Sequence, residues 1–112
     1  MKIYHNPRCR KSRETLAIIN EKGVPVEVVE YLKEVPSASD LNDILTKLGI
    51  PADQLLRKGE KVYKESFKGK NMSNDQWIKV MLDNPVLIER PIVVTEGKAV
   101  LGRPPENVLE LL

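Results

Sequence analysis

The sequence predicts an α/β fold, and three regions of the chain support this prediction. The first third reads as strand, helix and strand, the middle as helices, and the last third as a β-hairpin followed by a helix. A length of 112 residues fits one domain, and 41% hydrophobic with 30% charged residues is typical of a globular protein. We therefore expect a single domain over residues 1–112.

The first third begins with a short apolar strand over residues 2–4. An Asn-Pro pair then forces a turn, because proline fixes its own φ and disfavours the helical region in the residue before it. The spacing of apolar residues predicts a helix over residues 11–22, which Gly23 ends. Residues 26–31 are rich in β-branched side chains and predict a second strand, which would lie parallel to the first.

The middle of the chain, approximately residues 36–85, predicts a helical insertion. Ser37 is expected to cap one helix, with Asp40 three residues further on, and Gly49 ends that helix. A second helix starts at Ser73, and the basic segment between the two predicts a loop with short structure. The expected buried stripes of the two helices are Leu41, Ile44, Leu45 and Leu48, then Trp77, Ile78, Met81 and Leu82.

The last third predicts two short strands that flank a hairpin turn at Glu96-Gly97. Gly102 ends the second strand, and the two prolines that follow Arg103 suit the start of a final helix. A β-α-β half and a β-β-α half around one sheet form the thioredoxin-like arrangement. The helical insertion would then separate the two halves.

Composition excludes several kinds of function. The net charge of +2 is too small to indicate a nucleic acid or a membrane as partner. One cysteine and one histidine exclude an internal disulfide and a cysteine-rich metal site, so we expect no bound metal. The N-terminus lacks an apolar signal region, and no apolar run reaches membrane-spanning length. A lone thiol suits a reducing compartment, so we expect a cytoplasmic protein. We also expect the protein to be a monomer.

The only cysteine, Cys9, falls in the turn after the first strand, where the first helix starts. A helix N-terminus and nearby cations lower a thiol pKa from about 8.5 to roughly 3.5–7.5, and the same groups bind oxyanions. Arg13 lies one turn along the helix on the face of Cys9, so we expect it to support the thiolate. Ser12 is placed to donate a hydrogen bond to the sulfur, and His5 ends the strand. The alternative is that Cys9 is a small buried hydrophobic residue and that the charges are simply solvated.

Four segments, collinear over essentially the whole chain, carry a family resemblance. They are Y-H-N-P-R-C-R-K-S-R-E-T, L-L-R-K, N-P-V-L-I-E-R-P-I-V-V and G-R-P-P-E-N-V-L-E. Together they resemble the glutaredoxin-coupled arsenate reductases (the ArsC-like family) and their close relatives. The resemblance implies a thioredoxin-like fold with a helical insertion.

The resemblance also implies a role for each matching residue. Cys9 would be the nucleophile, with His5 and Ser12 supporting its thiolate, and the peptide bond before Pro91 would be cis, beside the thiol. The oxyanion would be held by three arginines: Arg57, Arg90 and Arg103. The chain departs from the family after the cysteine, where such reductases tend to carry small residues and this chain has Arg10 and Lys11.

The activity that the resemblance implies is the reduction of arsenate to arsenite, with glutathione and glutaredoxin as reductants. No cofactor would be bound, and glutathione would be a co-substrate. The lone cysteine agrees with this route, because the chain has no second thiol to resolve a disulfide internally.

Two other functions remain open from the sequence. One is a glutathione-dependent thiol reductase with another substrate, which the C-x-x-S arrangement of Cys9 and Ser12 permits. The other is a non-enzymatic regulator of the Spx type, which shares the fold and binds RNA polymerase. Familiar Spx-type proteins carry a second cysteine at the position of Ser12, and such a role would leave the three arginines without a purpose.

Overall fold

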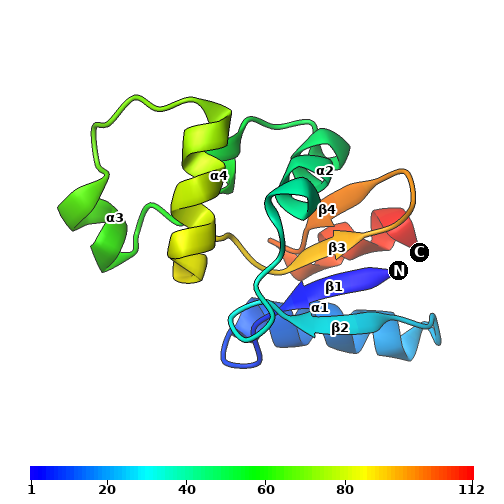
Figure 1. Cartoon of the computed structure of the whole chain (residues 1–112). Coiled ribbons are helices and arrows are strands. Elements are labelled where there is room, and N and C mark those ends of the chain that lie inside the picture. Colours follow the sequence, from blue (N-terminus) through cyan, green and yellow to red (C-terminus); the bar gives the residue numbers. More distant parts are fainter. The chain divides into compact units, whose positions relative to one another are not determined.

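The computed structural model describes residues 1–112 and divides into two units. The first unit consists of Met1–Glu34 and Arg90–Leu112, and the second consists of Val35–Glu89. All four strands belong to the first unit, whereas the second is built mainly from helices (Figure 1). The second unit covers the part of the chain in which the sequence predicts the helical insertion.

The first unit contains a four-stranded mixed sheet in the order β2-β1-β3-β4. Strand β1 (Lys2–His5) pairs in parallel with β2 (Glu27–Glu30) and antiparallel with β3 (Ile92–Val94). Strand β4 (Ala99–Leu101) completes a hairpin with β3. The parallel pair and the hairpin confirm the predicted α/β fold with its β-α-β and β-β-α halves.

Helix α1 (Arg10–Glu21) and the 3₁₀ helix η3 (Pro105–Leu111) pack on each other and against this sheet. The core between them consists of Ile3, Ile19, Val93, Val100 and Val108, all at most 8% exposed. Burying side chains of this size contributes about 1.5–3 kcal/mol each. The final helix expected from the sequence is therefore present, as a 3₁₀ helix with proline at its start.

The buried face of α1 begins with polar residues. Ser12 and Thr15 are fully buried, two turns and one turn before the apolar Ile19 respectively. The helix ends at Glu21 with Lys22 as its C-cap, and Gly23 then adopts a φ of +68°, a conformation that favours glycine. Apolar spacing thus located the helix, but it did not indicate that two hydroxyl side chains line its buried face.

The second unit contains five helical segments: α2 (Ala38–Leu48), η1 (Ala52–Leu55), α3 (Lys61–Ser66), α4 (Asn74–Asp83) and η2 (Pro85–Leu87). Ser37 and Ser73 cap α2 and α4, each in a reciprocal pair of hydrogen bonds with the residue three positions on. Gly49 ends α2 in the left-handed conformation. None of the helices of the protein is both long and apolar enough to span a membrane.

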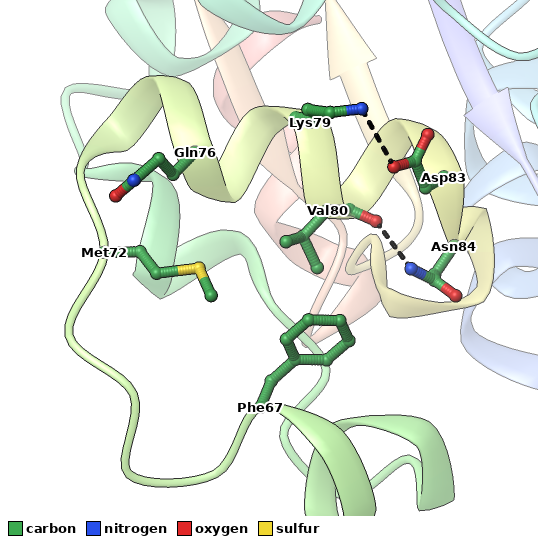
Figure 2. A pocket seen from close by; sticks show the side chains of 7 residues that line it. All are labelled: Phe67, Met72, Gln76, Lys79, Val80, Asp83 and Asn84. Atoms are coloured by element: carbon green, nitrogen blue, oxygen red, sulfur yellow. Dashed lines mark hydrogen bonds and ion pairs between the residues drawn. The ribbon is translucent and has the colours of Figure 1, made fainter.

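A pocket of about 260 Å³ lies in the second unit (Figure 2). Lys79 and Asp83 form an ion pair of 3.4 Å at its edge, and Asn84 Nδ2 donates to the carbonyl oxygen of Val80. The pocket contains none of the residues that the sequence predicts for the functional site. Its lining consists of Phe67, Met72, Gln76, Lys79, Val80, Asp83 and Asn84.

Candidate active site around Cys9

Cys9 is the N-cap of α1, with an extended backbone at φ −93° and ψ 121°. The turn before it is closed by two hydrogen bonds of 3.0 Å, from Cys9 N–H to the carbonyl oxygen of Asn6 and from Arg8 N–H to Asn6 Oδ1. The first backbone N–H groups of a helix have no partner within it. The Asn-Pro turn therefore holds a partly exposed thiol at the end of the helix that offers free donors.

The pKa of the Cys9 thiol lies below its ordinary value. Burial is the largest single influence and by itself raises the pKa. Hydrogen bonds to the thiolate from the backbone of Ser12, the side chain of Arg90 and the backbone of Lys11, together with the positive charge of Arg90, outweigh it. These interactions favour the ionised, nucleophilic form of the sulfur.

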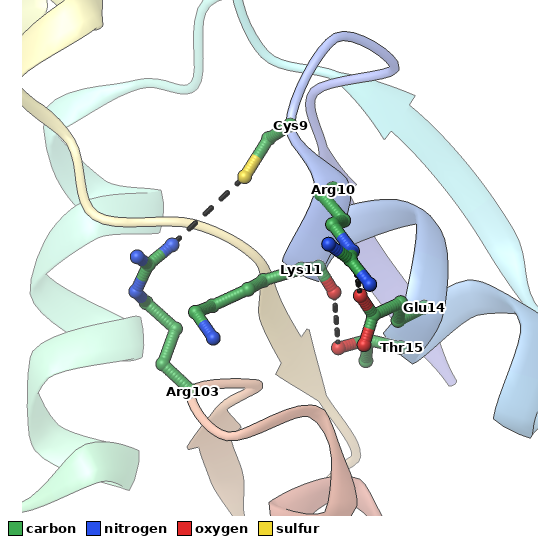
Figure 3. Close-up of polar contacts among 6 residues, drawn as sticks. All are labelled: Cys9, Arg10, Lys11, Glu14, Thr15 and Arg103. Carbon is green, nitrogen blue, oxygen red and sulfur yellow. Dashed lines mark hydrogen bonds and ion pairs between the residues drawn. The ribbon is translucent and has the colours of Figure 1, made fainter.

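Arg103 is the second arginine at the sulfur. Its Nη1 lies 3.9 Å from Cys9 Sγ (Figure 3) and donates a hydrogen bond of 3.1 Å to the carbonyl oxygen of Arg90. Arg90 is only 9% exposed. The bonds Arg90–Pro91 and Arg103–Pro104 are both cis. Two arginines that are both far from Cys9 in the sequence thus lie beside the thiol.

His5 and Ser12 form a buried pair behind the thiol. His5 Nδ1 lies 2.6 Å from Ser12 Oγ, which also accepts a hydrogen bond of 3.1 Å from Asn6 N–H. Ser12 was expected to reach the sulfur through its hydroxyl, but in the structure its backbone N–H does so. Burial is the main cause that lowers the pKa of His5, with Arg13 lowering it further and Glu30 opposing.

The other cations of the segment have different partners. Arg13 Nη1 donates a hydrogen bond of 3.0 Å to the carbonyl oxygen of Pro7, and Arg13 is not among the groups that lower the Cys9 pKa. Arg10 Nε lies 2.8 Å from Glu14 Oε1 (Figure 3). Arg13 therefore supports the turn that carries the thiol, rather than the thiolate itself.

Arg57 belongs to the second unit, where it lies near two carboxylates. Its Nε is 3.4 Å from Glu60 Oε1 and 3.9 Å from Glu89 Oε1, and its backbone N–H donates to the carbonyl oxygen of Leu87. Of the three arginines predicted to bind an oxyanion, the structure therefore places two, Arg90 and Arg103, in the unit of Cys9.

Thr15 and Gly102 are neighbours of the site, and nothing in the sequence pattern singled out Thr15. Thr15 Oγ1 donates to the carbonyl oxygen of Lys11 at 2.8 Å and lies 3.4 Å from that of Gly102. Gly102 N–H donates to the carbonyl oxygen of Pro91 at 2.9 Å. A Cβ at Gly102 would lie 2.7 Å from Pro91 Cγ and would also clash with Thr15, so only glycine permits this approach.

Asn107 holds the loop that carries Arg103. Its Nδ2 donates to the carbonyl oxygens of Leu101 and Arg103 at 3.1 and 3.2 Å. The glycine beside Arg103 offered a sequence signal for this loop, whereas nothing in the sequence pattern singled out Asn107. No group of three or more His, Cys, Asp and Glu side chains is arranged to hold a metal ion.

The sequence and the fold both match known proteins. The ArsC family profile matches residues 4–111. An arsenate reductase of Neisseria meningitidis is 44% identical over 100% of this chain and 97% of that protein. An uncharacterized Escherichia coli protein, YfgD, is 52% identical over 100% of this chain and 96% of its own. The solved structure of an arsenate reductase from Vibrio cholerae gives a TM-score of 0.94 at 45% identity, covering 100% of this chain and 98% of that one. These matches confirm the thioredoxin-like fold and the resemblance.

Proposed function

Since this chain belongs to the ArsC family, we propose that it is an arsenate reductase that reduces arsenate to arsenite through the Cys9 thiolate. One observation carries the proposal: a thiol with a lowered pKa at a helix N-terminus, with Arg103 Nη1 3.9 Å from its sulfur. The arsenate reductase of Neisseria meningitidis, 44% identical over the whole chain, supports the choice of substrate.

Arsenate is a tetrahedral anion, and its charge must be neutralised before a thiolate can approach it. Arg90 and Arg103 supply guanidinium groups, which bind oxyanions through paired N–H donors. The backbone N–H groups of Lys11 and Ser12 add donors at the positive end of α1. The family resemblance adds Arg57, which belongs to the second unit, as a further predicted oxyanion ligand.

The chemistry at Cys9 balances with two thiols. The Cys9 thiolate attacks arsenic and displaces an oxygen ligand, which leaves as water. The thiol of glutathione then attacks the Cys9 sulfur, a sulfur–sulfur bond forms, and the electron pair of the sulfur–arsenic bond stays on arsenic. Arsenic is thereby reduced from As(V) to As(III), and arsenite leaves.

A mixed disulfide between Cys9 and glutathione remains after this step. The chain has no second cysteine to resolve it, so an external thiol must attack. We assign this step to glutaredoxin, with glutathione as co-substrate and no bound cofactor. Because glutathione is kept reduced in the cytoplasm, we place the protein there.

The proposal is tested by arsenate-dependent consumption of NADPH in the presence of glutathione, glutaredoxin and glutathione reductase. We expect turnover with the wild type and none with Cys9→Ser, because a serine hydroxyl is too basic to be ionised at neutral pH. Substantial turnover by Cys9→Ser would remove Cys9 from the mechanism. An inactive wild type with a reactive thiol would move the function to another thiol substrate.

A further inference from the structure

Lys11 is a cation beside the thiol that the proposed reaction does not yet use. Among its neighbours, Arg10 is paired with Glu14, Arg13 with the carbonyl oxygen of Pro7, and Arg103 with the Cys9 sulfur. The side chain of Lys11 is exposed and has no carboxylate partner. It is therefore a cation at the site that is available to a ligand.

The Lys11 side chain leaves the first turn of α1 and points toward Arg103 (Figure 3). Arg103 is also the residue toward which Cys9 Sγ is directed. The guanidinium of Arg103 is itself turned toward Cys9, so two positive charges gather on this side of the thiol. Like charges repel, and a bound anion relieves that repulsion. The ammonium group of lysine is a compact charge on a flexible stem, which suits an anionic group at some distance from the sulfur.

We propose that Lys11 binds a carboxylate of the thiol co-substrate and so makes Cys9 selective for anionic thiols such as glutathione. Arg90 and Arg103 act at the sulfur itself, where the oxyanion must lie, whereas the exposed end of Lys11 suits the more distant carboxylate of a peptide thiol. The inference rests on the proposed function, since a thiol co-substrate is needed only if it reacts at Cys9.

Thiol–disulfide exchange isolates this recognition from arsenate. When the Cys9 thiolate attacks glutathione disulfide, one sulfur–sulfur bond breaks, Cys9 becomes linked to glutathione, and glutathione thiolate leaves. Bis(2-hydroxyethyl) disulfide undergoes the same exchange without any carboxylate. Both rate constants are measured by mass spectrometry of the intact protein, and the constant for glutathione disulfide is divided by that for bis(2-hydroxyethyl) disulfide. This rate ratio reports recognition of the carboxylates, because a change in thiolate reactivity affects both rate constants equally.

The test compares the wild type with Lys11→Gln and with Lys22→Gln. Lys22 is an exposed lysine at the opposite end of α1, about 16 Å from Lys11 at the rise of an α-helix, so its loss changes the net charge equally. We expect the rate ratio to fall about two- to fivefold in Lys11→Gln, the scale of one exposed charge pair, and to stay unchanged in Lys22→Gln. Added salt should lower the wild-type ratio toward that of Lys11→Gln.

Two results would overturn the inference. An unchanged ratio in Lys11→Gln would remove Lys11 from recognition, and equal slowing with both disulfides would mean that it acts only on the thiolate. Either result, combined with normal arsenate turnover by the wild type, would leave the proposed function intact. A selective exchange without any arsenate turnover would instead contradict the proposed function alone.

Discussion

The guanidinium of Arg103 lies 3.9 Å from the sulfur of Cys9, although 94 positions separate the two residues in the chain. The relationship arises because β4 ends beside the start of α1, where Gly102 allows the two segments to approach closely. A cysteine that follows β1 thus meets an arginine that follows β4.

Arg103→Ala should weaken binding of arsenate by about 1.5–3 kcal/mol, the scale of a hydrogen bond to a charged group. Isothermal titration with arsenate, in the absence of any added thiol, measures this loss. Lys98→Ala is a matched control, because Lys98 pairs with Glu110 on the surface and its loss removes the same charge. Equal arsenate affinity in Arg103→Ala and the wild type would place Arg103 outside the oxyanion site.

Arg90→Gln should raise the pKa of Cys9, because it removes both a hydrogen bond to the thiolate and a positive charge. The rate of alkylation by iodoacetamide, followed from about pH 4 to about pH 9, gives the midpoint of the thiolate. We expect the wild-type midpoint below about 8.5, the ordinary value for cysteine, and a higher midpoint in the variant.

The same lowered pKa has a consequence for stability. Ionised Cys9 stabilises the folded protein above the pKa of the unfolded thiol, and this contribution disappears as the pH falls through the lower pKa of the folded state. The Arg90→Gln variant must first be verified as folded by circular dichroism. If its thiolate forms at the same alkylation midpoint as in the wild type, Arg90 is not a cause of the lowered Cys9 pKa.

Gly102→Ala should lower the free energy of unfolding by about 1–3 kcal/mol, the usual cost of forcing a methyl group into a packed site. The new Cβ would meet both Pro91 and Thr15. Gly97→Ala, in the hairpin turn with open space around it, should change the same free energy by less than about 0.5 kcal/mol. Urea denaturation measures both, and a Gly102→Ala variant as stable as Gly97→Ala would disprove the close approach.

His5 should make the protein less stable in mildly acidic solution. Its pKa is lowered in the folded state, so the unfolded chain binds more protons as the pH falls below about 6.5. Stability is therefore complete above that pH and declines below it. We expect the difference in unfolding free energy between about pH 7.5 and about pH 5.5 to shrink in His5→Gln. An identical difference in the folded variant would mean that His5 is not buried in its neutral form.

Much of this structure could be predicted from local patterns. The helix boundaries at Ser37, Gly49 and Ser73 follow from side chains that satisfy the free backbone groups at helix ends, and such signals are local in the sequence. The place of Cys9 at the start of α1 follows in the same way from the Asn-Pro pair before it.

What could not be predicted depends on partners that are distant in the chain. Thr15 is buried because its hydroxyl lies near the backbone of Gly102, 87 positions away, and a pattern of apolar residues cannot reveal a polar residue that is buried with its partner. The partner of Arg13 was misjudged for a related reason. Helical spacing places Arg13 on the face of the thiol, but a long side chain reaches whichever acceptor is nearest, here the carbonyl oxygen of Pro7.

A single turnover without glutaredoxin tests the central claim most directly. The protein is mixed with arsenate and glutathione, arsenite is quantified after chromatographic separation, and the mass of the intact protein is measured. We predict one equivalent of arsenite for each protein molecule that gains a glutathione on Cys9, and neither product with Cys9→Ser. Arsenite formed without a glutathione adduct on Cys9, or formed equally by Cys9→Ser, would contradict the account.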